Sequence, residues 1–167
     1  YGSGRPVVAL LGEFDALPGI SQAVSPVREP LAEQAAGHAC GHHLFGVGSA
    51  AAAIAVKEWL SSRATSGTVR YYGTPAEEGG SGKVYMVREG LFDDVDVVLH
   101  WHPSDENDAS PQTSLANRSA KFRFYGLSSH ASSAPQVGRS ALDGVEAMNY
   151  MVNLMREHIP STARIHY

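Results

Sequence analysis

Three short segments rich in apolar residues constrain the fold most, because each has the length and composition of a buried strand. They are "PVVALLG" at 6–12, "TVRYYGT" at 68–74 and "DVDVVLHWH" at 94–102. Short apolar runs bounded by turn or polar residues are typical of strands that are covered on both faces. The chain therefore offers three strands for one sheet.

Helices are expected between these strands. Residues 45–63 are rich in alanine with a polar edge at Lys57 and Glu58, and residues 82–92 form a shorter segment closed by Gly90. Alternation of strands and helices favours a parallel sheet with right-handed crossovers, so we predict the α/β fold class. Ligands of such sheets bind beyond the carboxyl ends of the strands, which makes the residues after each strand the first candidates for a site.

The character of the sequence changes after Pro103. Residues 104–112 are polar and contain a proline, as expected for a linker or hinge. Beyond them the pattern predicts a half-exposed strand at 119–126, an amphipathic helix at 138–159 and the start of another strand at 163–167.

This change predicts two domains, at 1–112 and 113–167. A strand, a helix and the start of a strand cannot close a stable layer alone. We therefore expect the sequence to end inside its second domain, as a fragment of a longer protein.

Composition narrows the classes of partner. The chain has 167 residues, 43% of them hydrophobic and 18% charged, which fits one globular domain or parts of two. A net charge of −4 without a basic run gives no reason to expect a nucleic acid or an anionic membrane, so the ligand is expected to be small. The apolar run at 50–56 is too short to span a bilayer. A single cysteine and the lack of a signal-like N-terminus predict a cytoplasmic protein.

The segment "GHACGHHLFGVG" at 37–48 places the only cysteine among three of the eight histidines. Two further groups follow the other predicted strands, so three groups fall on the same predicted edge of the sheet. Thiolate, imidazole and carboxylate are the ligands that zinc-like ions accept. The groups are the Cys-x-His pair Cys40 and His42, the pair Glu77 and Glu78, and the His-x-His pair His100 and His102.

Each group also has an ordinary explanation. Cys40 could be a buried core cysteine, or a nucleophile whose thiol pKa is lowered by the helix that follows it. The glutamates could form a solvated turn, and the histidines could be core or surface residues. The "GGSGK" at 79–83 does not match a phosphate-binding loop, because Glu77 and Val84 stand where that pattern needs Gly and Ser or Thr. The coincidence of three groups at one edge favours a metal centre.

The motifs at this edge resemble the M20 family of metallopeptidases and amidohydrolases. Within it they are most similar to the branch of aminoacylases, hippurate hydrolases and auxin-conjugate hydrolases, and in particular to amidohydrolases of the aminobenzoyl-glutamate utilization protein B type. A later segment, "SSHASSAPQVGRSALD", resembles the lid motif of the family. The matching motifs, in the order of the family, are "GEFDALPGISQ", "HACGHHLFGVGSAAAA", "GTPAEEGGSGK" and "VLHWHP".

This resemblance implies a fold, cofactors and a substrate class. It implies a zinc-exopeptidase-like catalytic domain followed by an α+β, ferredoxin-like lid domain through which the protein forms a homodimer. It implies two divalent metal ions, zinc or manganese, with cobalt as a further option. The implied reaction is hydrolysis of the amide bond of an N-acyl or N-aroyl amino acid or a small dipeptide.

The resemblance also implies roles for single residues. Glu77 would be the general base, Asp15 would orient a ligand histidine, and His130 would reach from the lid into the site of the neighbouring protomer. His43 stands where many relatives have aspartate, and a further histidine ligand of the family has no counterpart in this sequence. The implied metal ligands are Cys40, His42, Glu78 and His102.

A different class of function stays open, because one ligand and half of the family fold are missing from the sequence. The chain could instead be a metal-binding interaction domain or a fragment without catalytic activity. Metal content separates the two, since a working centre should hold two ions and a remnant one or none.

Overall fold

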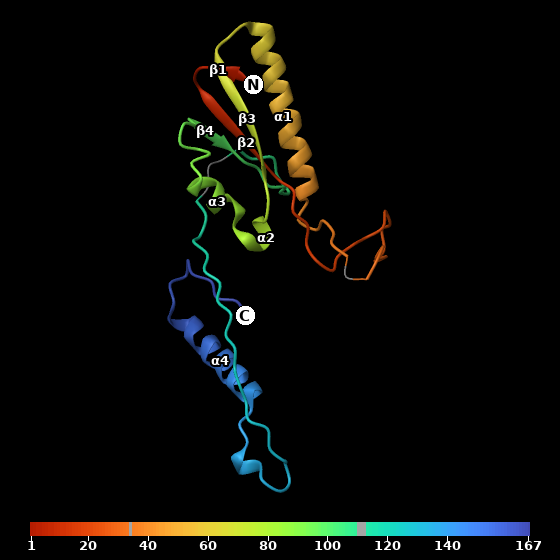
Figure 1. Cartoon of the computed structure of the whole chain (residues 1–167), viewed down its shortest axis with the longest axis vertical. Helices are drawn as coiled ribbons and strands as arrows, with labels where there is room; N and C mark the ends of the chain where they lie inside the picture. The colour runs from red at the N-terminus through yellow and green to blue at the C-terminus, as the bar shows by residue number, and fades with distance from the viewer. Residues whose placement is uncertain (34, 110–112) are drawn as a thin grey trace. The chain divides into compact units, whose positions relative to one another are not determined.

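The computed structural model describes residues 1–33, 35–109 and 113–167, which form two compact units (Figure 1). The first unit is Tyr1–Asn107 and the second is Asp108–Tyr167. The first unit holds the sheet and three helices, and each unit is described by itself below.

The sheet has four strands in the order β1-β3-β2-β4. The strand β2 (Val7–Glu13) pairs in parallel with β3 (Gly67–Thr74) on one side and with β4 (Val97–Leu99) on the other. This confirms the predicted α/β class and parallel pairing, although the third strand is shorter than the apolar run suggested. The short β1 (Gly2–Ser3), which the sequence did not predict, pairs antiparallel with β3.

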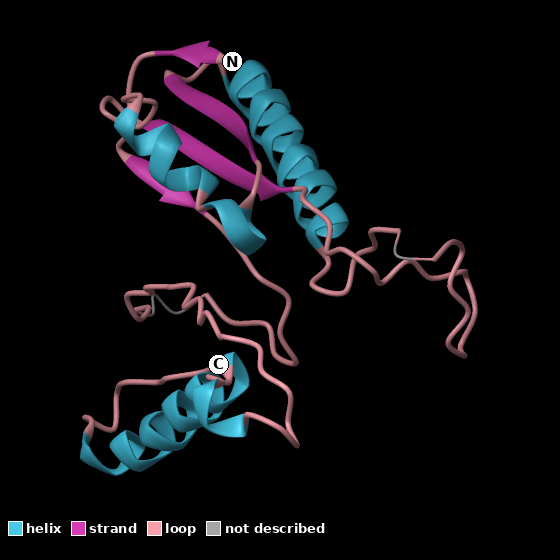
Figure 2. Cartoon of the chain, turned by 60° about the horizontal axis from the view of Figure 1, so that its bottom comes forward, coloured by secondary structure: helices cyan, strands magenta, loops and turns pink. Residues whose placement is uncertain are grey.

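Helices cover both faces of this sheet. Figure 2 shows α1 (His42–Arg63) along one face, with α2 (Glu77–Gly80) and α3 (Gly82–Arg88) on the other. The side chains of β3 alternate accordingly. The hydroxyl of Tyr71 donates to the carbonyl of Gly46 in α1, whereas the hydroxyl of Tyr72 donates to the carbonyl of Leu91, after α3.

The core lies between α1 and the sheet and is small. Leu10, Leu60 and Val69 form its buried cluster, with Ala53 packed against it. A close approach of strand and helix needs glycine here, because a Cβ at Gly12 would lie 2.7 Å from the Tyr71 hydroxyl and 3.1 Å from the Cα of Gly46.

The helix α1 has 22 residues and a mean hydropathy of 1.2 over 18 of them, so by length and composition it is able to cross a membrane. The sequence-based expectation that no segment is long enough to span a bilayer considered only residues 50–56, whereas the helix runs over His42–Arg63. The same properties describe a core helix, and α1 packs on β2 and β3. The length and hydropathy of this one helix are therefore weak evidence for a membrane span.

The second unit contains α4 (Ala141–Met155), flanked by the short 3-10 helices η1 (Pro135–Val137) and η2 (Arg156–His158). The predicted helix at 138–159 is therefore present but shorter. Ser140 caps α4, since its hydroxyl accepts the N–H of Asp143 at 3.1 Å.

The two strands predicted in this unit were wrong. Residues 119–126 and 163–167 have no regular secondary structure and no strand pairing. A strand needs a neighbour for its ladder hydrogen bonds, and among the described residues of this unit the only ladder-type pair is the isolated bridge of Leu127 with Arg139. All side chains at 119–126 are exposed, and one of them contacts a helix: the ring of Phe124 lies 2.6 Å from where a Cβ on Gly144 of α4 would be.

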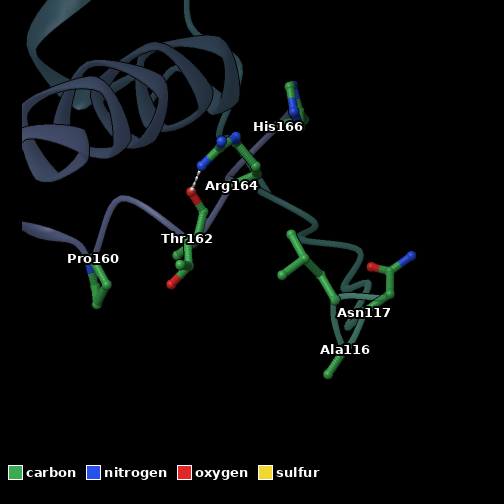
Figure 3. Close-up of a pocket in the computed structure, with 8 residues that line it drawn as sticks. Ala116, Asn117, Pro160, Thr162, Arg164 and His166 are labelled. Carbon is green, nitrogen blue, oxygen red and sulfur yellow. Dashed lines mark hydrogen bonds between the residues drawn. The ribbon is translucent and has the colours of Figure 1, made fainter. Parts of the chain in front are cut away.

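The second unit also contains a cavity of about 510 Å³, drawn in Figure 3. Arg164 and His166 lie on one of its walls and Asn117 on another. The remaining lining residues are Leu115, Ala116, Pro160, Thr162 and Ala163, and none of the eight is a candidate site residue from the sequence.

The packing of α1 gives a test of this fold. Phe45 is fully buried, and its ring centroid lies 5.1 Å from that of His42 and 5.0 Å from that of Trp101, whereas its neighbour Leu44 is exposed. Phe45→Ala should lower the free energy of unfolding by about 3–5 kcal/mol, because it leaves a cavity. Leu44→Ala should lower it by less than about 1 kcal/mol. Guanidinium unfolding followed by circular dichroism measures both, and equal losses would contradict the packing described.

Candidate metal centre

The carboxyl ends of the strands meet at one edge of the sheet, and the polar residues of the sequence gather there. Glu13, the last residue of β2, is in register with Thr74, the last residue of β3. The chain then continues from β3 into Glu77 and Glu78, and from β4 into residues 100–102. The structure thereby brings Asp15, Cys40, His42, Glu77, Glu78 and His102 into one cluster of the first unit.

A closed loop brings Asp15 and Cys40 together. Leu17 and Gly37 form an antiparallel bridge with reciprocal 2.9 Å hydrogen bonds, so the chain returns beside the end of β2. Glycine is required at the return, because a Cβ at Gly37 would lie 2.3 Å from the carbonyl oxygen of Ile20.

His42, the first residue of α1, is the centre of the cluster and is only 1% exposed. Its Nδ1 lies 3.0 Å from both the carbonyl oxygen and Oδ1 of Asp15, so Nδ1–H donates and Nε2 carries the lone pair. This Nε2 is buried without a hydrogen-bond partner. It faces three carboxylates, at 3.1 Å from Glu13, 3.6 Å from Glu77 and 3.8 Å from Glu78. A lone pair that faces carboxylate oxygens is unfavourable unless a proton or a metal ion lies between them.

Asp15 connects His42 to α2. Its Oδ2 accepts the backbone N–H of Glu78 at 2.9 Å while its Oδ1 accepts from His42. Burial by itself raises the pKa of Asp15, but the backbone N–H groups of the Glu77 and Glu78 segment outweigh it and lower the pKa. Asp15 is therefore an ionised orienting group for a histidine, as metal-binding histidines require.

Cys40 and His102 form a second contact of the cluster. The Cys40 Sγ lies 3.3 Å from His102 Nε2, and His102 Nδ1 donates to the carbonyl of Pro103 at 2.9 Å. Burial, together with the charges of Glu78 and Glu77, raises the pKa of the Cys40 thiol. A thiol among carboxylates is a poor nucleophile without a cation, which weakens the alternative of a cysteine nucleophile.

Two sets of side chains are arranged so that they could hold a metal ion. One is Cys40, His42 and Glu78, and the other is Glu13, His42 and Glu77; in each set the donor atoms lie within 4.8 Å of one another. Because Asp15 occupies Nδ1 of His42, only Nε2 can ligate, so the two sets describe one ion position at His42 rather than two. A further ion would depend on the other donors, which include His102 beside Cys40.

Sequence reasoning missed two residues of this cluster, Glu13 and Lys83. The Glu13 side chain is 3% exposed, and its Oε1 accepts hydrogen bonds from Lys83 Nζ and, at 2.9 Å, from His100 Nε2. The signal was a charged residue at the end of a buried strand, which must find a partner. The two histidines of the predicted His-x-His pair therefore have different partners: His100 contacts Glu13, and His102 contacts Cys40.

Three other histidines, His38, His43 and His130, lie outside these contacts. The ring of His43 stacks beside that of His38, with centroids 4.6 Å apart, and both side chains are exposed. His130 belongs to the second unit, where its Nδ1 accepts the N–H groups of Ser132 and Ser133 at 3.2 Å each. Because Nδ1 accepts these bonds, Nε2 carries a ring proton, for which the described part of the chain offers no hydrogen-bond acceptor.

Comparison with known proteins places these features in a family. The model of peptidase family M20/M25/M40 matches residues 9–161. In Escherichia coli K12, the p-aminobenzoyl-glutamate hydrolase polypeptide designated B is 51% identical over 170 aligned positions, which cover all of this chain and 35% of that protein. The human Xaa-Arg dipeptidase is 36% identical over 97% of this chain and 34% of its own length. The hippurate hydrolase of Campylobacter jejuni is 31% identical over 60% of this chain and 25% of its own length.

This chain spans about a third of the length of the relatives that it matches along its whole extent. No solved structure matches it. The family model covers both compact units and the entire carboxyl edge of the sheet, including the cysteine, histidine and glutamate residues described above. The chain belongs to peptidase family M20/M25/M40, a family of hydrolases.

Proposed function

We propose that this chain carries the metal-binding part of an M20 amidohydrolase that cleaves the amide bond of an N-acyl or N-aroyl amino acid or a small dipeptide. The observation that carries the proposal is the buried Nε2 of His42, which has no hydrogen-bond partner and faces three carboxylates. The names of the relatives support the substrate class, since p-aminobenzoyl-glutamate and hippurate are both amides of an aroyl group with an amino acid.

In this proposal Cys40, His42, Glu78 and His102 hold two divalent ions, zinc or manganese, with cobalt as a further option. Divalent ions there would polarise the scissile carbonyl and lower the pKa of a water molecule. The ligands are preorganised by their own partners: Asp15 holds His42, and the carbonyl of Pro103 holds the Nδ1–H of His102.

The two adjacent glutamates take different roles. The Glu77 side chain is 43% exposed and Glu78 is 27% exposed with its backbone held by Asp15. Glu77 can therefore reach water and substrate, accept a proton from the attacking water and return it to the leaving amine. Glu78 is held in place as a ligand.

The second domain predicted from the sequence, residues 113–167, is proposed to be the lid; it lies within the second unit, Asp108–Tyr167. His130 would donate its Nε2–H to the substrate carbonyl in the site of a neighbouring chain, since Ser132 and Ser133 occupy Nδ1. The homodimer predicted from the sequence is less well supported than a complex with a different chain. Both polypeptides of the E. coli p-aminobenzoyl-glutamate hydrolase are relatives, because the one designated A is also 29% identical over 98% of this chain. The cytoplasmic location stays a prediction.

The role of Cys40 can be tested by metal binding. Cys40→Ser nearly keeps the volume of the side chain but removes a thiolate ligand. Metal affinity should fall by more than the roughly 10–100-fold that loss of an outer hydrogen-bonding partner costs. Competition with a chromophoric chelator measures it, and His43→Asn, which changes an exposed histidine next to a proposed ligand, is the control. Unchanged affinity in Cys40→Ser would remove Cys40 from the ligand set.

The division of labour between the glutamates can be tested in the purified full-length protein that carries this chain. Glu77→Gln removes the proton acceptor, so metal should stay bound while hydrolysis of an N-aroyl amino acid falls by roughly 10² or more. Glu78→Gln replaces a carboxylate ligand by an amide, so metal should be lost first, and excess metal should restore part of the rate.

Metal content by mass spectrometry and turnover are measured on the same samples. If Glu77→Gln is the variant that sheds metal, the two roles are assigned the wrong way round. A wild-type protein that binds at most one ion and hydrolyses no acyl amino acid would favour a metal-binding domain without catalytic activity.

A further inference from the structure

We propose that Lys83 and Glu13 form a built-in neutral ion pair that keeps the Glu13 carboxylate from acting as a ligand and thereby sets the charge of the metal centre. The inference rests on the proposed function, because it concerns the metal affinity of the same cluster. It assigns Lys83 as a positioning residue; both members of the pair lie within motifs of the sequence, which by themselves give neither of them a role.

The pair joins two elements from opposite sides of the cluster. Glu13 is the last residue of β2, and Lys83 lies in the first turn of α3. Lys83 Nζ and His100 Nε2 both donate to Oε1 of Glu13, whereas Oε2 is directed to His42 Nε2 at 3.1 Å. One oxygen of Glu13 is thus used by cations of the protein itself, and the other is close enough to compete for a bound metal ion.

Burial makes this pairing necessary. The Glu13 side chain is 3% exposed, and an unpaired buried carboxylate is strongly unfavourable. Lys83 and His100 supply the partners of Oε1, so Glu13 is held as a paired, charged carboxylate beside the proposed ion position.

A count of charges shows why a lysine belongs there. With Cys40 as a thiolate, it and the carboxylates of Asp15, Glu77 and Glu78 carry four negative charges, which balance two divalent ions. Glu13 would be a fifth, and the ammonium group of Lys83 cancels it. Removal of Lys83 alone leaves excess negative charge at the centre, and removal of Glu13 alone leaves a positive charge that repels metal ions.

The same pair also anchors the segment that carries the two glutamates. The short helix α2 is flanked by Ala76 at φ 55° and Ser81 at φ 52°, two non-glycine residues in the left-handed region. Such backbone persists only where surrounding contacts hold it. Asp15 holds one end through the N–H of Glu78, and Lys83 holds the other through Glu13.

Metal affinity in a double-mutant cycle tests the proposal. In the purified protein, Zn²⁺ affinity is measured by chelator competition for Glu13→Gln, Lys83→Gln and the double variant. Glu13→Gln should bind Zn²⁺ roughly tenfold more weakly, and Lys83→Gln should bind it more tightly. A change of roughly tenfold is expected for one charge a few ångströms away in a partly screened site. The double variant should return to within about threefold of the wild type.

Matched controls separate this effect from a general change of charge or stability. Lys57→Gln and Glu58→Gln remove the same charges near the far end of α1, about 22 Å along the helix from His42 at 1.5 Å per residue, and should leave the affinity unchanged. Lys83→Arg keeps the charge and should also bind like the wild type. If Glu13→Gln fails to fold, the comparison of Lys83→Gln with Lys83→Arg still tests the proposal, because only Lys83→Gln removes the charge.

The outcomes are distinct. If Glu13→Gln loses metal and the added Lys83→Gln does not restore it, Glu13 is a direct ligand and the proposal is wrong. If all variants bind Zn²⁺ equally and differ only in their unfolding free energy, the pair has a purely structural role and the proposal is also wrong. A wild-type protein that binds no Zn²⁺ overturns the proposed function itself, and the inference with it.

Discussion

The hydrogen bond between Asp15 and His42 is the interaction on which the rest of the site depends, because it decides which nitrogen of a buried imidazole is left over. With Nδ1–H bound to Asp15 at 3.0 Å, Nε2 becomes a lone pair directed at the oxygens of three carboxylates. Neither the histidine nor the carboxylates gain from that arrangement by themselves. A divalent cation would resolve the conflict, and the same Asp15 that creates it also holds the backbone of Glu78.

The fold can place these groups together because its strands are parallel and end in register. Glu13 is opposite Thr74, so the segments that leave β2 and β3 start at the same level and supply carboxylates to one volume. Close packing of α1 on its face of the sheet helps to hold the ends of β2 and β3 in this register. The hydroxyl of Tyr71 reaches Gly46 of α1, and a side chain at Gly12 would prevent that approach. The buried ring of Phe45 packs beside the site, against the rings of His42, Trp101 and His102.

The charged residues of the cluster fall into two groups. The residues proposed as ligands face the ion position, while Glu13 is tied to Lys83 and His100 on the side of α3. A buried carboxylate without such partners would bind a proton or a metal ion. In the proposed centre, pairing Glu13 with Lys83 would leave four negative charges, those of Cys40, Asp15, Glu77 and Glu78, which equal the charge of two divalent ions.

Much of this site could be predicted from the sequence, because the spacing of apolar runs and polar residues is a local property. The three strands, α1 and the gathering of cysteine, histidine and glutamate residues at one edge follow from that pattern, and the family resemblance agrees with the match over residues 9–161. The alternation at 119–126 was misleading, since a strand also needs a partner strand, and Phe124 packs on α4 instead.

Only the tertiary structure could decide how the side chains pair. His100 contacts Glu13, His102 contacts Cys40, and Lys83 contacts Glu13 at the end of β2. These contacts depend on how β2, α3 and the segment after β4 are placed relative to one another. Sequence spacing specifies which residues follow each strand, because the chain is continuous. It does not specify which of them meet, because that depends on sheet register, on the closed loop after Asp15 and on the direction in which each helix leaves the edge.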